Sequence, residues 1–255
     1  MESKDKLAAL GFPYANSVIQ MFEGGSKMHG AKLEGTDDTD WYGVFIEPPA
    51  KILGVDSYEH FVWTTGGERG GNKPSDIDVT LYSLQKWARL ACKGNPSVLH
   101  FLFAKDLWGL PYWHRIKENR TMFLARAHMG QFMGYANAQL QRLFNQRGQK
   151  NCNRPFLEEQ HGYDTKYAMH IIRLLHEARE FLSTANITLP RPEKELLIQI
   201  RKGDFKLHEI LAMANSLQEA VLGAKEASPL PDKVDRRAVS ELISDIYLKF
   251  YAENL

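Results

Sequence analysis

Three short segments in the first half of the chain carry apolar side chains in runs or in alternation with polar ones. They cover residues 17–24, 40–48 and 76–84, and clusters of turn-forming residues lie between them. Short segments of this kind, rich in Val, Ile, Phe and Tyr, are typical of β-strands. We therefore expect the first half of the chain to contain a sheet.

The second half of the chain repeats its apolar positions at the spacing of an α-helix. The segment 164–186 has an apolar stripe at intervals of three and four residues, which predicts a helix with one buried side. Its members are Ala168, Ile171, Ile172, Leu175 and Leu182. Two further helices are predicted over 205–227 and 235–255. The pattern indicates a mixed first domain, residues 1–115, and a helical second domain, residues 116–255.

Composition adds a size and a charge to this picture. The 255 residues are 44% hydrophobic, which is sufficient for a sizeable buried core. The net charge is +1, so charge gives no global argument for a nucleic-acid or membrane partner. Cys92 and Cys152 match neither a zinc spacing nor a disulfide framework, and residues 1–14 contain no long apolar segment. We expect a cytoplasmic protein without a membrane span, and nothing here predicts an oligomeric state.

A glycine pair and a serine follow the first predicted strand. Gly24 and Gly25 allow a tight turn, and Ser26 is expected to cap the short helix after it. Backbone amides exposed at such a turn bind phosphate, so a triphosphate site is one interpretation and an ordinary turn is the other. No Walker A motif is present.

Carboxylates are concentrated just before the second predicted strand. Because side chains two residues apart in a strand point to the same face, Asp38 and Asp40 should converge while Asp37 points away. Two carboxylates held together repel unless a cation meets them, and Mg²⁺ prefers such oxygen ligands. The alternative is an acidic turn exposed to solvent.

The third predicted strand begins with two more acidic residues. Asp76 and Asp78 alternate at its start, and an adjacent strand would bring one of them beside Asp38 and Asp40. Three carboxylates around two divalent ions form the arrangement that supports in-line phosphoryl transfer.

These motifs together resemble the nucleotidyltransferases of the DNA polymerase β superfamily. The order is Gly25-Ser26, then Asp38-Thr39-Asp40, then the apolar strand that follows. The segments 78–103, 163–182, 200–211 and 228–232 extend the similarity, which covers about residues 17–235. Over these segments the chain is most similar to the nucleotidyltransferases associated with RNA-repair operons in bacteria and phages.

The resemblance implies an α+β, polymerase β-like fold, with a short mixed sheet and flanking helices. An α-helical C-terminal domain would follow and close the nucleotide cleft. It also implies that Gly25 and Ser26 hold the β- and γ-phosphates and that Asp38, Asp40 and Asp78 bind two Mg²⁺ ions. Two departures leave the register open: Asp37 stands where the family usually has serine, and the spacing from Gly30 to the aspartate pair is one residue longer. Asp37 therefore rivals Asp38. Asp76 is a separate rival to Asp78 as the third acid.

Three basic residues share one stripe of the helix predicted over 164–186. Lys166, His170 and Arg173 lie at positions i, i+4 and i+7, a spacing that by itself is typical of a solvated basic face. The resemblance implies instead that they meet a triphosphate or an acceptor backbone. It also places Asn95, in a predicted turn, at the border of the nucleotide pocket, where it would contact base or sugar.

The expected function is magnesium-dependent transfer of a nucleoside monophosphate from a nucleoside triphosphate to an acceptor hydroxyl, with release of pyrophosphate. Asp78 is also the candidate to accept the proton of the attacking hydroxyl. The resemblance points to an RNA 3′ end, tRNA included, as acceptor. The alternatives are a protein or small-molecule acceptor, a non-catalytic nucleotide- or RNA-binding module, and one component of a toxin–antitoxin pair.

Overall fold

The computed structural model describes residues 4–33, 35, 38–65, 76–144 and 154–254. These residues form two compact units. The first consists of Met1–Lys93, Ser97–Phe123 and Val234–Leu255, and the second of Gly94–Pro96 and Leu124–Lys233. Among the described helices, none combines the length and the hydropathy that a membrane span requires.

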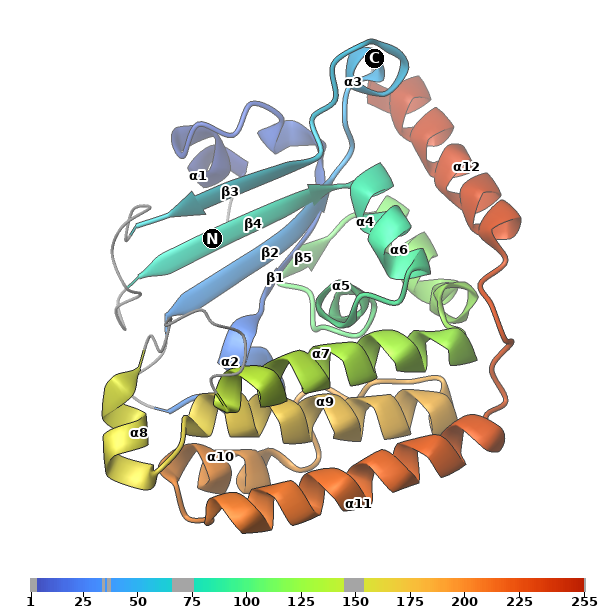
Figure 1. Cartoon of the computed structure of the whole chain (residues 1–255). Helices are drawn as coiled ribbons and strands as arrows, with labels where there is room; N and C mark the ends of the chain where they lie inside the picture. Colours follow the sequence, from blue (N-terminus) through green and yellow to red (C-terminus); the bar gives the residue numbers. More distant parts are fainter. Residues whose placement is uncertain (1–3, 34, 36–37, 66–75, 145–153, 255) are drawn as a thin grey trace. The chain divides into compact units, whose positions relative to one another are not determined.

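The first unit is built on a five-stranded mixed sheet with the order β3-β4-β2-β1-β5 (Figure 1). The strands β2 and β4 pair in parallel, and the other neighbours pair antiparallel. The strand bounds are β1 (Val18–Glu23), β2 (Thr39–Phe45), β3 (His60–Thr64), β4 (Ile77–Ser83) and β5 (Trp108–Gly109). The strands predicted over 17–24, 40–48 and 76–84 are thus present, and the α+β class is confirmed.

Helices cover both faces of this sheet. On one face α1 packs on a core that includes Leu7, Phe45 and Leu81, and on the other α4 and α6 pack against the strands. The Ser83 hydroxyl caps α4 by accepting from Lys86 N at 3.2 Å. The helices of this unit are α1 (Lys4–Ala9), α2 (Gly25–His29), α3 (Pro49–Leu53), α4 (Leu84–Cys92), α5 (Pro96–Leu99, from Ser97 on), α6 (Pro111–Glu118) and α12 (Arg236–Asn254).

The second unit is a helical bundle around α9. Asp164 caps α9 by accepting from the backbone amides of Lys166 and Tyr167 at 2.9 and 3.1 Å. The apolar stripe predicted for this helix is buried, and α7, α8, α10 and α11 pack around it (Figure 1). The bounds are α7 (Met129–Leu143), α8 (Pro155–His161), α9 (Thr165–Thr184), α10 (Lys194–Lys202) and α11 (Leu207–Glu226).

The helix α12 belongs to the first unit, although it follows the whole helical bundle in sequence. It packs against α4 and α6. Tyr247 donates a hydrogen bond to the buried Glu47 carboxylate and accepts one from Gln85 N at 3.0 Å. The division between the units therefore differs from the boundary expected after residue 115, because both ends of the chain pack into the sheet unit.

Candidate functional site

Three carboxylates meet at one end of the parallel strand pair. Asp38, Asp40 and Asp78 each place an oxygen within 4.8 Å of the others, and all three side chains are half-buried. Asp40 is the register partner of Asp78 across the β2–β4 ladder, and Asp38 lies two residues before Asp40. Since side chains two residues apart along extended chain point to the same face, Asp38, just before β2, and Asp40, within it, both reach the carboxylate of Asp78.

Asp76, the rival to Asp78, does not join this group. Asp76 is buried, and its Oδ1 accepts a hydrogen bond from Thr65 Oγ1 at 3.1 Å. The Asp76 carbonyl accepts from Thr39 N at 2.9 Å, which holds it to the start of β2. Asp37 lies outside the described residues. The structure thus brings together the three acids predicted first, with Asp78 rather than Asp76 from β4.

The glycine turn after β1 lies directly against these carboxylates. The amide of Gly24 donates to the Asp40 carbonyl at 2.9 Å. Gly25 has φ +59°, and a Cβ there would lie 2.0 Å from Oδ2 of Asp40. A side chain at Gly25 would therefore occupy the place of a carboxylate oxygen, which explains why the position requires glycine.

Ser26 lies inside α2 and is half-buried. The N-cap of this helix is Gly24, and no side-chain cap hydrogen bond forms there. The prediction that Ser26 caps the helix was wrong, because the helix begins two residues earlier than expected. Its hydroxyl is therefore not committed to capping α2.

Tyr42 forms an aromatic floor beneath the carboxylates, and the sequence analysis missed it. It follows Asp38 and Asp40 at the same two-residue spacing, and its ring packs on Phe22 and Phe101 at centroid distances of 5.7 and 5.9 Å. Burial raises the pKa of Tyr42, and the nearby Asp40 carboxylate raises it further. Tyr42 therefore stays neutral beside the carboxylates. The alternation of positions 38, 40 and 42 was the available signal.

The second unit carries its own concentration of positive charge on and around α9. Burial lowers the pKa of His170 well below its ordinary value, and the cations Arg173 and Lys166 lower it further. Arg154 and Arg201 act on His170 in the same direction, so the basic cluster contains two residues that the helical stripe could not reveal. The structure therefore gathers Lys166, His170 and Arg173, with His170 as a neutral imidazole.

Partners inside the second unit orient two of these arginines. Arg173 donates to the buried Glu177 carboxylate at 2.8 Å. Arg154 forms an ion pair with Asp164 at 2.9 Å, and its guanidinium lies 5.0 Å from the centre of the Tyr167 ring. These contacts hold both guanidinium groups in place, and each group is paired with a carboxylate.

Asn95 lies in the turn after α4, as predicted. The preceding Gly94 has φ +75°, and a Cβ there would overlap the His128 ring. The Asn95 amide donates to the Tyr135 hydroxyl at 2.9 Å. The turn is thus held firmly in the second unit, although nothing in it tests a contact with base or sugar.

The sequence and fold were also compared with known proteins. Residues 2–244 match the family described as "RNA repair pathway DNA polymerase beta family". An uncharacterised 38.9 kDa protein from the nrdC–mobD intergenic region of Enterobacteria phage T4 is 31% identical over 121 residues. That match covers 43% of this chain and 35% of the phage protein. A nucleotidyltransferase-like protein from Exiguobacterium sibiricum 255-15 aligns over 97% of this chain and 76% of its own, with 13% identity and a TM-score of 0.31.

Proposed function

The chain belongs to the RNA repair pathway DNA polymerase beta family, and from that premise we propose that it is a nucleotidyltransferase, with a reaction, a cofactor and an acceptor as follows. It transfers a nucleoside monophosphate from a nucleoside triphosphate to the hydroxyl of an RNA 3′ end, and it uses Mg²⁺. The observation that carries this proposal is the meeting of Asp38, Asp40 and Asp78.

The chemistry of the three acids suits two magnesium ions. Three half-buried carboxylates with oxygens within 4.8 Å form an all-oxygen donor set, which is the kind that Mg²⁺ prefers. Without a cation the three carboxylates repel one another. Asp38, Asp40 and Asp78 would hold the ions, which when bound neutralise charge on the attacking oxygen and on the leaving pyrophosphate.

The glycine turn supports a triphosphate site beside these acids. Gly25 allows the backbone to approach Asp40 closely, so phosphates bound at Gly25 and Ser26 would lie next to the carboxylate group. Backbone amides and the Ser26 hydroxyl would donate to the β- and γ-phosphates. The acceptor hydroxyl attacks the α-phosphorus, and its proton passes to Asp78. The bond between the α-phosphorus and the oxygen that bridges to the β-phosphate breaks, which releases pyrophosphate.

The basic cluster supports a role in binding polyanions. Lys166 and Arg173 would donate charge-assisted hydrogen bonds to the triphosphate or to the acceptor backbone, with neutral His170 as a weaker contact. Asn95 remains the candidate for base or sugar contact. The association of the family with RNA repair favours RNA as the acceptor. The net charge of +1 gives no general preference for RNA.

The test is to incubate the protein with Mg²⁺, total RNA and each α-labelled nucleoside triphosphate in turn. We expect label on an RNA band, loss of that label after Asp40→Asn, and retention after Asp76→Asn, whose carboxylate contacts Thr65 instead. Label on protein alone would contradict the RNA acceptor. An active Asp40→Asn enzyme would contradict the proposed role of the carboxylates.

A further inference from the structure

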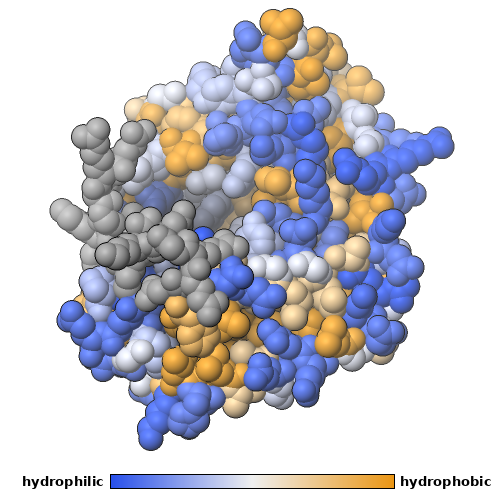
Figure 2. All heavy atoms as spheres, viewed as in Figure 1, coloured by the Kyte–Doolittle hydropathy of each residue, from blue (hydrophilic) through white to orange (hydrophobic). Residues whose placement is uncertain are grey.

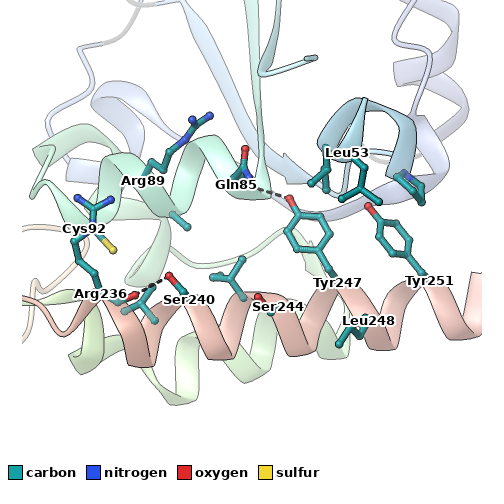
Figure 3. Close-up of a pocket in the computed structure, with 15 residues that line it drawn as sticks. Leu53, Gln85, Arg89, Cys92, Arg236, Ser240, Ser244, Tyr247, Leu248 and Tyr251 are labelled. Atoms are coloured by element: carbon teal, nitrogen blue, oxygen red, sulfur yellow. Dashed lines mark hydrogen bonds between the residues drawn. The ribbon is translucent and has the colours of Figure 1, made fainter. Parts of the chain in front are cut away.

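A second concave surface lies in the first unit and shares no residue with the carboxylate site. It is a groove of 460 Å³ between α12 on one side and α3 and α4 on the other (Figure 3). Its floor is apolar and includes Ala88, Val239 and Ile243, all of which are buried. Pockets of small-molecule ligands have volumes of about 300–1,000 Å³, so the groove is large enough for one.

The rim of this groove is also apolar. Leu53 and Leu248 line it and are 86% and 68% exposed. Figure 2 shows hydrophobic residues gathered at the top of the view, over the region that α3 occupies in Figure 1. Exposed apolar surface beside a hollow marks a place where an apolar group binds.

Polar atoms in the groove are mostly satisfied by the protein itself. The Tyr247 hydroxyl is shared between Glu47 and Gln85, and the Tyr251 hydroxyl donates to the Glu47 carbonyl. The Ser240 hydroxyl donates to the Arg236 carbonyl at 2.7 Å. The body of a ligand therefore needs few polar groups, since these three hydroxyls already have partners.

Charge is confined to one end of the groove. Figure 3 shows Arg236 and Cys92 at this end and the tyrosines at the other. Arg89, the other charged lining residue, forms an ion pair with Glu59. Among the residues that the structure describes, Arg236 has no acidic partner, and none of the lining residues is acidic. An anionic group would thus be favoured at the Arg236 end.

The groove is also elongated. Its lining residues on α12 run from Arg236 to Tyr251, a distance of about 22 Å at about 1.5 Å per residue. We propose that this groove binds a single extended acyl chain that ends in a carboxylate, with the carboxylate at Arg236 and the chain lying toward Tyr247. This ligand class is independent of the nucleotidyl transfer proposed above.

The probes are dodecanoate and dodecylammonium, which share a chain and differ in the sign of the head group. Both are titrated below their micellar concentrations into the full-length protein and followed by calorimetry. We expect dodecanoate to bind with one site per chain and dodecylammonium to bind at least tenfold more weakly. Arg236→Glu should weaken dodecanoate on the order of tenfold, the loss expected for one charge-assisted contact.

Two tryptophan variants on α12 test the position of the site. Ser244→Trp would fill the groove and abolish binding, because Ser244 is an exposed lining residue. Glu241→Trp is the control, because Glu241 is exposed on the same helix and does not line the groove. In a Cys152→Ser background, dodecanoate should also slow the reaction of Cys92 with N-ethylmaleimide.

Three results would overturn the proposal. They are no dodecanoate binding by the wild-type protein, equal binding of dodecylammonium, and dodecanoate binding that Arg236→Glu and Ser244→Trp leave unchanged. Circular dichroism of each variant shows whether it is folded. Because no readout involves nucleotide transfer, failure here leaves the proposed enzymatic function untouched.

Discussion

Asp40 of β2 lies opposite Asp78 of β4 in a parallel ladder, and their carboxylates approach each other together with that of Asp38. Like charges this close raise the free energy of the folded protein when no cation is bound. The same arrangement that suits a cation is therefore a source of instability in its absence.

Stability and activity should consequently respond in opposite directions when one charge is removed. In buffer with EDTA, Asp78→Asn should raise the melting temperature by about 2–4 °C, as expected for about 1 kcal/mol in a protein of this size. The same variant should lose nucleotidyl transfer by about 1,000-fold, since charge stabilisation by bound metal contributes several kcal/mol. Differential scanning calorimetry and the labelling assay measure the two effects. A wild-type protein more stable than the variant in EDTA would contradict the repulsion argument.

Gly25 should tolerate no side chain. Gly25→Ala brings a Cβ to 2.0 Å from Asp40 Oδ2 and also forces an L-residue to φ +59°. The matched control is Gly11→Ala, where φ is +87° and no atom lies within 4 Å of the new Cβ. Gly11→Ala should lose only about 1 kcal/mol from the backbone conformation. Gly25→Ala should lower the free energy of unfolding, measured in urea, by more than Gly11→Ala does, and it should also lose transfer activity. If the two variants lost the same free energy of unfolding, the Asp40 side chain would be able to move aside freely.

Tyr247→Phe should destabilise the first unit, and more so at higher pH. Burial raises the pKa of Glu47, while hydrogen bonds from Ser83 and Tyr247 oppose that shift. Because the folded pKa lies above the unfolded one, ionisation of Glu47 opposes folding as pH rises through this range, and protonation relieves the cost at lower pH. Tyr247→Phe removes a hydrogen-bond donor from the Glu47 carboxylate. The loss should lower the free energy of unfolding by about 1.5–3 kcal/mol when the carboxylate is charged.

The control for that variant is Tyr251→Phe, whose lost hydroxyl donates to the Glu47 carbonyl rather than to its carboxylate. Its cost should depend far less on pH. Urea unfolding at pH 5 and pH 8 compares the two variants. The same pH dependence in both would show that Tyr247 does not stabilise the charged form of Glu47.

His170 should remain neutral well into the acid range. Burial and the surrounding cations lower its pKa, so the unfolded state binds the proton more readily and the free energy of unfolding falls as pH drops below about 6.5. Arg154→Met should raise the pKa of His170, because it removes one of the cations that lower it. Arg179→Met is the control: Arg179 lies on α9 with His170 but is not among these cations, so the pKa should change little. Two-dimensional NMR of the imidazole measures the shift. A value near 6.5 in the wild-type protein would contradict the cationic environment.

Sequence patterns were sufficient for features that depend on local spacing. The two-residue period placed Asp38 and Asp40 on one face, and the helical period identified the buried stripe of α9. The choice between Asp76 and Asp78 could not be made this way, because the two residues have the same two-residue spacing at the start of the strand predicted over 76–84. It depends on the register that pairs Asp40 with Asp78, which forms between segments distant in sequence.

Other features were out of reach for the same reason. The two residues of β5 are too few for a periodic pattern. Arg154 and Arg201 join the basic cluster from outside α9, so no spacing along that helix could include them. The sequence predicted a helix over 235–255, but its pattern does not show whether that helix packs on the helical bundle or on the sheet unit. Its place was decided by tertiary partners such as Glu47 and Gln85.

The position of α12 has a consequence for biosynthesis. Chains emerge from the ribosome N-terminus first and domains generally fold as units. The sheet, α4 and α6 are made early, yet the packing of α4 and α6 against α12 must wait until more than one hundred further residues have been translated, as the interval from Phe123 to Val234 requires. A nascent chain stalled within the bundle would therefore expose the apolar surfaces of α4 and α6, and such an unfinished intermediate would be a natural substrate for chaperones.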